Sequence, residues 1–251
     1  MTLTLTPLLG IPLIHRGDNL ADILLIGLRA SNIALADGDI LVVTSKIVSK
    51  AEGRMVDLAN VTPSERALNL ARQSDKDPRV VELMLQESSE ILRVRVGTII
   101  VEHRLGFVCA NAGIDHSNVD PTEDWVLLLP ENPDRSAEQI RHKIEAVTDT
   151  RLGVLVIDSH GRAWRNGTVG VAIGLSGLPG LVDLRGQPDL FGFRLRITQV
   201  GAADELAAAA SLVMGQAAEG APAVHVRGFP YPLRESRLEE LLRPREQDLF
   251  R

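Results

Sequence analysis

The chain has 251 residues, of which 45% are hydrophobic and 24% are charged, and its formal net charge is −6. This length allows one large domain or two small ones, and the composition allows a sizeable buried core. The acidic balance and the scarcity of aromatic residues exclude the basic, ring-stacking surface that nucleic-acid-binding proteins need.

Helices and strands are expected to alternate along the chain, which favours a mixed α/β (α+β-like) fold with mixed sheets and flanking helices. In chain order, we expect strand 2–6, helix 19–30, strand 40–44, helices 63–73 and 78–86, strands 94–102 and 107–110, helix 136–147, strands 152–157, 169–174 and 193–200, helix 203–217 and strand 223–226. Residues 235–251 are mostly charged, with Leu238, Leu241 and Leu242 on one helical stripe.

The N-terminal residues lack the basic stretch and unbroken apolar run of a signal peptide, and no apolar run approaches the ~18 residues that cross a bilayer. We therefore expect a cytoplasmic protein without a membrane partner. No repeat or composition break marks a domain boundary. Residues 1–251 are accordingly expected to form a single unit, or two interleaved lobes whose boundary the sequence does not reveal.

Two familiar phosphate-binding motifs are missing. The sequence contains no GxxxxGK[ST] loop and no GxGxxG after a strand, so it carries neither a P-loop nor a Rossmann motif. A nucleotide bound here would need metal ions and scattered donors instead. Mg²⁺ and Mn²⁺ suit this role, because a few carboxylates together with phosphate oxygens can hold them.

Two aspartates are placed for such a site. Asp115 and Asp158 each follow an apolar strand directly, together with small polar neighbours. Ligands usually bind at strand ends in α/β proteins. The alternative is that each aspartate caps a turn, as aspartates commonly do.

Other candidates lie near the first central strand. Ser45 and Lys46 follow strand 40–44, and Lys50 lies four residues beyond Lys46. Two lysines there suit phosphate oxygens, although solvated helix lysines are equally common. The apolar segment 10–14 does not suit catalysis, but its backbone could line a pocket for a nucleotide base.

A zinc site and an arginine site are weaker hypotheses. His116 and His160 lie next to the two aspartates, but their spacing matches no zinc motif. The only cysteine, Cys109, lies in an apolar run and is expected to be a buried, unreactive thiol. Arg162 and Arg165 could bind anionic groups, or could be ordinary surface arginines.

Seven segments carry a family resemblance, and they follow one another in order. They are GIPLI (10–14), VVTSKIVSKAEGR (42–54), PSERA (63–67), NAGIDHSNV (111–119), VLVIDSHGRAWRNGTVGVAIGLSG (154–177), DLFGFRL (189–195) and ADELAAAASLVMGQAAEGAPAVHVRG (203–228). In these segments the chain resembles the coenzyme F420:L-glutamate ligase family. Some actinobacterial members carry an additional C-terminal nitroreductase-like domain, which we do not expect in this chain.

The resemblance implies an activity, cofactors and partners. It implies a GTP-dependent ligase of coenzyme F420 biosynthesis that adds L-glutamate, and further glutamates, to coenzyme F420-0 through an acyl phosphate. Mg²⁺ or Mn²⁺, as two ions, would assist, with K⁺ as a further candidate cation, and the protein would be a homodimer. The alternatives are a nucleotide- or deazaflavin-binding module without catalysis and a metal-dependent phosphohydrolase.

The resemblance also implies roles for single residues. The implied metal ligands are Asp115, Asp158, Ser159 and Gln216; a neutral glutamine at the last position would reduce the negative charge of the site. The implied nucleotide contacts are Ile11, Pro12, Leu13, Ile14, Ser45, Lys46, Lys50 and Asn118. The implied catalytic residues are Asp115, Asp158 and Lys50.

Overall fold

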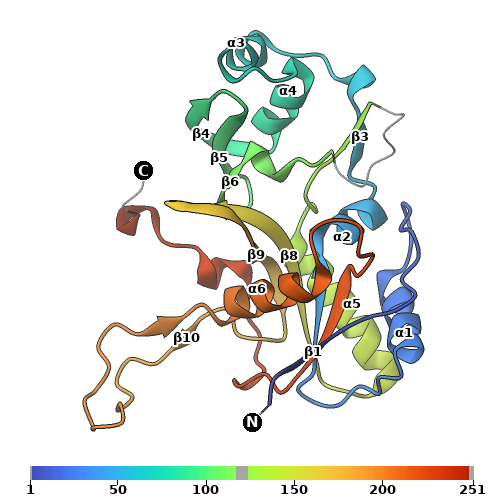
Figure 1. Cartoon of the computed structure of the whole chain (residues 1–251), viewed down its shortest axis with the longest axis vertical. Helices are drawn as coiled ribbons and strands as arrows, with labels where there is room; N and C mark the ends of the chain where they lie inside the picture. Colours follow the sequence, from blue (N-terminus) through green and yellow to red (C-terminus); the bar gives the residue numbers. More distant parts are fainter. Residues whose placement is uncertain (1, 117–123, 249–251) are drawn as a thin grey trace.

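A five-stranded sheet forms the centre of the molecule (Figure 1). The computed structural model describes residues 2–116 and 124–248. The strand order is β1 (Thr4–Pro7), β12 (Ala223–Arg227), β2 (Ile40–Thr44), β8 (Gly153–Arg162) and β9 (Arg165–Ser176). Only β2 and β8 pair in parallel within this sheet, and the other neighbours are antiparallel.

Helices cover both faces of this sheet. Leu41 and Val43 of β2 face a core formed with α1 (Leu20–Ala30), α2 (Ser45–Glu52) and α5 (Pro133–Thr148). Ile40 and Val42 face the opposite core, which includes α6 (Ala202–Met214). Successive side chains of a strand point to opposite faces, so burial on both faces explains why β2 is a continuous apolar run. The sheet, these helices and the segments that join them are called the sheet body.

Two glycines let helices approach β9 closely. A Cβ atom at Gly170 would lie 2.5 Å from the carbonyl oxygen of Ala207 in α6. A Cβ atom at Gly174 would lie 2.3 Å from the Cβ of Pro133 in α5. The alanines of α6, including Ala203, Ala207 and Ala210, are therefore packed against the sheet of their own chain.

Residues 55–127 form a second lobe, which lies above the sheet body in Figure 1 and has its own apolar core. Its elements are β3 (Met55–Asp57), the 3-10 turn Leu58–Asn60, α3 (Glu65–Ser74), α4 (Pro78–Gln86), β4 (Ser88–Arg95), β5 (Thr98–His103), β6 (Val108–Ala110), the 3-10 turn Asn111–Gly113 and β7 (Trp125–Leu127). β3 and β7 pair antiparallel where the chain enters and leaves the lobe.

The second lobe is joined to the sheet body through Glu87, which is buried at the C-terminal end of α4. Its carboxylate accepts hydrogen bonds from Arg54 (2.8 Å) and Arg104 (2.9 Å). Those arginines also donate to the carbonyl oxygens of Leu129 and Glu131. Burial alone would raise the pKa of Glu87, but the contacts with His103, Arg54 and Arg104 lower that pKa to about 2.

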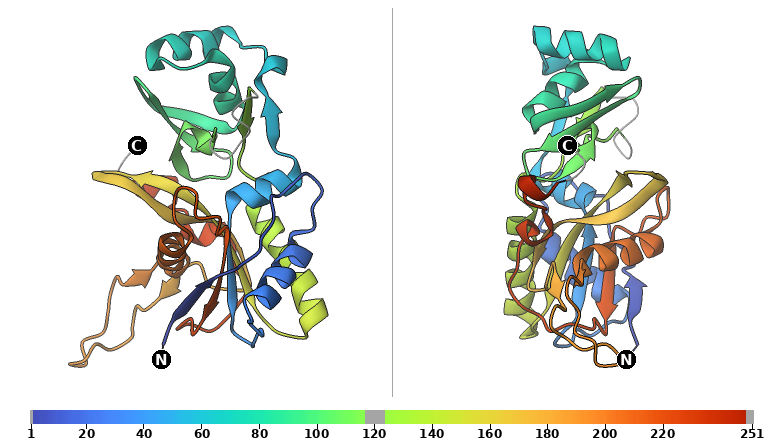
Figure 2. Two further views of the ribbon diagram at one scale, coloured as in Figure 1. Left: turned by 45° about the vertical axis from the view of Figure 1, so that its right-hand side comes forward. Right: turned by 90° about the vertical axis from the view of Figure 1, so that its left-hand side faces the viewer.

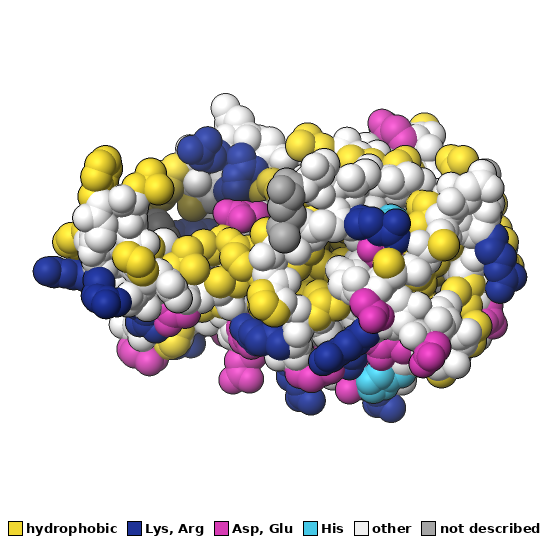
Figure 3. All heavy atoms as spheres, turned by 90° about the horizontal axis from the view of Figure 1, so that it is seen from below, with side chains coloured by type: hydrophobic (Ala, Val, Ile, Leu, Met, Phe, Trp, Pro, Cys, Tyr) yellow, Lys and Arg dark blue, Asp and Glu magenta, His cyan; other side chains and the backbone are white. Residues whose placement is uncertain are grey.

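A long arm, residues 182–200, projects from the sheet body on the side away from the second lobe (Figure 2). Its base is paired through β10 (Val182–Asp183) and β11 (Gln199–Val200), and an isolated antiparallel bridge joins Pro188 to Arg194 nearer the tip. Leu190 is 98% exposed and Phe191 is 95% exposed near its tip. Figure 3 shows hydrophobic side chains along the arm and on the adjoining surface of the body.

The expected mixed α/β fold is confirmed, but several element boundaries were wrong. Strand 94–102 is a hairpin of β4 and β5 that turns at Gly97, which has a φ of +82°. Strand 193–200 forms a regular strand only at Gln199–Val200, with one isolated bridge from Arg194 to Pro188. The helix expected from 136 begins at Pro133, because Asn132 caps it by accepting from the Arg135 amide.

Three other expectations also differ. The segment after Thr44 forms helix α2, which was not predicted as an element. The last helix ends at Met214 rather than 217, with Gly215 at its C-cap. The charged C-terminal stretch has only the 3-10 turns Leu238–Leu241 and Arg245–Gln247 where the structure describes it.

In the described residues, 2–116 and 124–248, no helix is long and apolar enough to span a bilayer.

Candidate functional site

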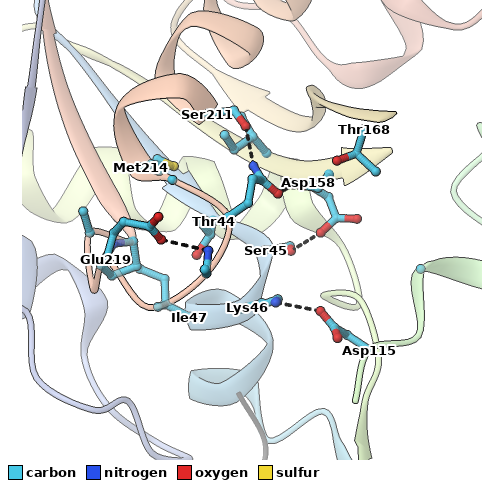
Figure 4. A pocket seen from close by; sticks show the side chains of 18 of the residues that line it. Thr44, Ser45, Lys46, Ile47, Asp115, Asp158, Thr168, Ser211, Met214 and Glu219 are labelled. Carbon is cyan, nitrogen blue, oxygen red and sulfur yellow. Dashed lines mark hydrogen bonds and ion pairs between the residues drawn. The ribbon is translucent and has the colours of Figure 1, made fainter. Parts of the chain in front are cut away.

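A cavity of about 710 Å³ lies beside the ends of β2 and β6, between the sheet body and the second lobe. Separate parts of the chain supply its walls: the loop after β1, the β2–α2 junction, residues 110–115, the outer half of β8 and the loop 215–222. Figure 4 shows the side chains that point into it.

The cavity gathers most of the residues singled out in the sequence. Its lining includes Ile11, Pro12, Leu13, Ile14, Ser45, Lys46, Lys50, Asp115, Asp158, Ser159 and Gln216. Asn118 lies outside the described residues. The structure therefore brings the described candidates to one place, and their individual roles stay predictions.

Helix α2 begins directly where β2 ends. Thr44 is its N-cap residue, with extended backbone angles and no capping hydrogen bond from its side chain. The first turn of α2 contains no acidic residue, and Ser45, Lys46 and Ile47 of that turn line the cavity. Backbone N–H groups and the helix dipole favour an anion at such a terminus.

The sequence predicted that Asp158 directly follows a strand. In the structure, Asp158 lies inside the strand β8. β8 continues to Arg162 because its outer half pairs with β9 as a hairpin. Ser45 Oγ donates to Asp158 Oδ1 at 2.6 Å, and His160 Nε2 lies 3.1 Å from Oδ2. Burial alone would raise the pKa of Asp158, but the contacts with His160 and Ser45 hold that pKa below its ordinary value.

Asp115 reaches the cavity from the end of the second lobe. Its backbone exchanges two hydrogen bonds with Leu127, of 3.0 and 2.8 Å. Its carboxylate forms an ion pair with Lys46, with 2.7 Å between Nζ and Oδ2, and both side chains are about one-third exposed. This ion pair crosses from the second lobe to α2.

Lys50 lies one helical turn beyond Lys46, on the same face of α2. Burial lowers the pKa of Lys50 and the Lys46 ammonium adds to this effect, while Asp115 opposes it. The cavity therefore has two lysines close together in an incompletely hydrated setting. An anionic ligand between them would relieve their repulsion.

Gln216 is held by two serines. Its Oε1 accepts from Ser159 Oγ at 2.9 Å, and its Nε2 donates to Ser211 Oγ at 2.8 Å. Gly215 precedes it at the C-cap of α6, with a φ of +75°. The amide oxygen of Gln216 thus lies beside the residue that follows Asp158.

Sequence reasoning missed several lining residues. Thr168 of β9 and Glu219 of the loop after α6 face the cavity (Figure 4). The Glu219 carboxylate also accepts from the Ala217 amide at 2.8 Å. Both residues lie in the segments of family resemblance, which was the only available signal. Arg162 and Arg165 are exposed at the tip of the β8–β9 hairpin and do not line the cavity.

The donor atoms fit a hard divalent cation. Carboxylates, a serine hydroxyl and an amide oxygen face the cavity, and oxygen donors of this kind suit Mg²⁺ and Mn²⁺. No group of three or more His, Cys, Asp or Glu side chains suited to a metal occurs in the part of the chain that the structure describes. Mg²⁺ often uses one or two carboxylates together with substrate phosphates, so the presence of two aspartates is compatible with a Mg²⁺ site.

Cys109 is buried, and burial raises its pKa to about 12, which confirms the expected burial of this thiol.

Fold and site together define a mixed α/β protein with carboxylates and lysines around a helix N-terminus. The family model of F420-0:gamma-glutamyl ligase matches residues 9–228. The coenzyme F420:L-glutamate ligase of Methanothermobacter thermautotrophicus is 49% identical, over 100% of each chain. The enzymes of the same name from Methanocaldococcus jannaschii and Archaeoglobus fulgidus are 46% identical (86% of each chain) and 43% identical (100% of this chain, 97% of the relative). The chain belongs to the F420-0:gamma-glutamyl ligase family.

Proposed function

We propose that this protein is a GTP-dependent ligase that joins L-glutamate to coenzyme F420-0, and further glutamates by the same route. The observation that carries the proposal is the single cavity that contains Asp115, Asp158, Lys46 and Lys50 beside the N-terminus of α2. Family membership supports the ligase class and its substrates.

The reaction follows from the chemistry of the acceptor. A carboxylate does not react with an amine at neutral pH, because an oxide is a poor leaving group. Transfer of the γ-phosphoryl group of GTP to that carboxylate gives an acyl phosphate and GDP. The amine of glutamate then attacks the acyl carbon, an amide forms, and phosphate leaves with the bonding electron pair. A base takes up the proton lost by the amine.

The residues of the cavity suit the first step. Phosphoryl transfer depends on positioning and charge neutralisation more than on covalent help. Lys50 would hold a phosphate oxygen, the amides at the start of α2 would bind another, and the apolar segment 11–14 would line the base. Asp115, Asp158, Ser159 and Gln216 would hold Mg²⁺ or Mn²⁺, which supply positive charge to the phosphates when bound.

The direct test is mass spectrometry of F420-0 after incubation with GTP, Mn²⁺ and L-glutamate. We expect a product heavier by one or more glutamate residues and release of GDP that depends on glutamate. GDP released at the same rate without glutamate would instead support a phosphohydrolase. Nucleotide binding with no turnover in any mixture would support a binding module.

We propose a homodimer for the same protein, and the arm is the main support. Its exposed apolar side chains include Leu190 and Phe191 near the tip and Ile197 nearer the base, and exposed apolar patches commonly mark protein contacts. Ala203, Ala207 and Ala210 of α6 pack inside their own chain, so they do not support dimerisation. Symmetric dimers are the commonest oligomers.

Light scattering tests the dimer. We expect a mass twice that of the 27.3 kDa chain, and a shift toward the single-chain mass in the variant Phe191→Ser. The variant Val147→Ser is the control, because Val147 is an exposed apolar residue on α5, outside the arm. A mass near 27.3 kDa at micromolar concentration would contradict the proposal.

A further inference from the structure

His160 occupies an unusual position beside the proposed metal site. Its side chain is only 10% exposed, and its Nε2 atom has no well-formed hydrogen bond among the described residues. That atom lies 3.1 Å from Asp158 Oδ2, at ion-pair distance. A buried polar atom without a well-formed hydrogen bond costs free energy, so this position of the imidazole calls for an explanation.

Phe107 packs against the ring of His160. The two ring centroids are 5.3 Å apart with an interplanar angle of 48°. Phe107 also stacks on His103, at 5.2 Å and 6°. Among the described residues, Phe107 packs against all three apolar cores, two in the sheet body and one in the second lobe.

The ring series therefore connects the junction of the two lobes with Asp158. His103 is fully buried, and its Nε2 lies 3.6 Å from Glu87 Oε2. Its Nδ1 accepts from the Leu105 amide at 3.1 Å. Glu87, which binds Arg54 and Arg104, thus lies at one end of the series, and Asp158 lies at the other.

We propose that His160, supported by the ring of Phe107, is a positioning residue that fixes the orientation of the Asp158 carboxylate. Ser45 contacts one carboxylate oxygen and His160 contacts the other, so the plane of the carboxylate is set from both sides. Without His160, the carboxylate would lose its contact at Oδ2 and could rotate more freely about its broad terminal torsion. This proposal rests on the proposed function, since it takes Asp158 to be a metal ligand.

The expected size of the effect follows from other metal sites. Removing a partner that orients a metal ligand costs roughly 10- to 100-fold in metal affinity or activity. His160→Leu should therefore weaken binding of Mn²⁺ by about tenfold or more. It should lower kcat while leaving the KM for glutamate unchanged. His160→Gln should restore much of the loss, because its amide nitrogen can reach the place of Nε2.

The primary experiment measures Mn²⁺ binding to the full chain without GTP or acceptor, by electron paramagnetic resonance titration. The melting temperature of the metal-free protein is recorded in parallel. His142→Leu is the matched control, since His142 is exposed on α5, away from the cavity. Phe107→Leu, which keeps apolar packing but removes the ring, should weaken Mn²⁺ binding in the same direction and by less than His160→Leu.

Two results would overturn the proposal. One is wild-type Mn²⁺ affinity in His160→Leu while Asp158→Asn loses it. The other is a loss in His160→Leu that His160→Gln does not restore at an unchanged melting temperature. If Asp158→Asn binds Mn²⁺ and turns over normally, the metal assignment in the proposed function fails instead, and the positioning role fails with it.

Discussion

Asp158 and Asp115 reach the cavity from different regions of the molecule, and they are held in different ways. Asp158 lies within β8 of the sheet body, where the β8–β9 pairing fixes its backbone and Ser45 and His160 contact its two oxygens. Asp115 lies at the edge of the second lobe, paired with Leu127 and linked to the sheet body by Lys46. Its side chain is 33% exposed, against 17% for Asp158.

The two aspartates therefore differ in what determines their positions in the site. The backbone position of Asp158 is set by the pairing of β8 with β9. The position of Asp115 also depends on how the second lobe sits on the sheet body, which Glu87 and its arginine partners control. Substitutions in the two regions should therefore alter the enzyme in different ways.

The largest effect on kcat is expected from substitution of Asp158. Asp158→Asn should lower kcat by about a hundredfold or more, because a lost metal ligand raises the barrier without emptying the core. Asp115→Asn should lower kcat less, by about tenfold, since Asp115 is the more hydrated carboxylate. GDP release at saturating substrates measures both variants, and circular dichroism checks the fold.

The ranking of the two aspartates is open to refutation. Near-normal turnover in both variants would remove the metal assignment. A larger loss in Asp115→Asn than in Asp158→Asn would show that the second lobe, rather than the sheet, supplies the main ligand.

Substitution of Glu87 tests the contact between the two regions. Glu87→Gln should lower the free energy of unfolding by about 2 kcal/mol at pH 7, because two arginines lose their shared carboxylate. The value is below that of a fully buried pair, since Arg54 and Arg104 are 22% and 31% exposed. Urea unfolding measures it, with Glu90→Gln as control, because the Glu90–Arg245 pair is exposed and should contribute less than about 0.5 kcal/mol.

The stabilising contribution of the Glu87 carboxylate should also depend on pH. The pKa of Glu87 in the folded protein, about 2, lies below its ordinary value of 4.5. Its stabilising contribution is thus fully present above about pH 4.5 and is lost as the pH falls toward 2. The difference in unfolding free energy between wild type and Glu87→Gln should shrink over that range. A difference that stays constant from pH 7 to pH 3 would contradict the assigned network.

The smallest expected effects concern the two lysines of α2. Lys50→Ala should lower kcat by about tenfold and raise the apparent constant for GTP, if its ammonium contacts the transferred phosphoryl group. Lys46→Ala should have a smaller effect, because Lys46 is engaged by Asp115. Steady-state kinetics at saturating acceptor and glutamate compares them. A severe loss in Lys46→Ala with near-normal Lys50→Ala would reverse the two roles.

Several elements were predictable because their signals are local. Strand 40–44 was predicted with its exact bounds from an apolar run after a turn. Helix 78–86 was predicted from Pro78 at its first position. The resemblance in separate segments also indicated residues that meet in the cavity, such as Ser45, Asp158 and Gln216.

The remaining features depend on contacts between distant residues. The outer half of β8 has no buried apolar pattern, so only its pairing with β9 reveals a strand. Helix α2 contains β-branched Ile47 and Val48 and has no capping side chain, so its sequence resembles a strand end. In the arm, a strand was predicted over residues 193–200, but the neighbouring segment pairs with it only through β10, the isolated bridge Pro188–Arg194 and scattered backbone hydrogen bonds, so most of it is not a regular strand. The contact of Phe107 with His160 joins two segments that no local pattern relates.

The order of strands in the sheet also determines when each part of the chain can fold. β2 pairs with β12 and β8, and Ser45 precedes Asp158 by 113 positions. Contacts over such separations form slowly, because a long loop must close first. The second lobe is continuous in sequence and has its own core, so during synthesis it can fold while β1 and β2 are still unpaired. The loop 215–222 and β12 follow β8, β9 and α6 in the chain, so the cavity can close only after all of these segments have been synthesised.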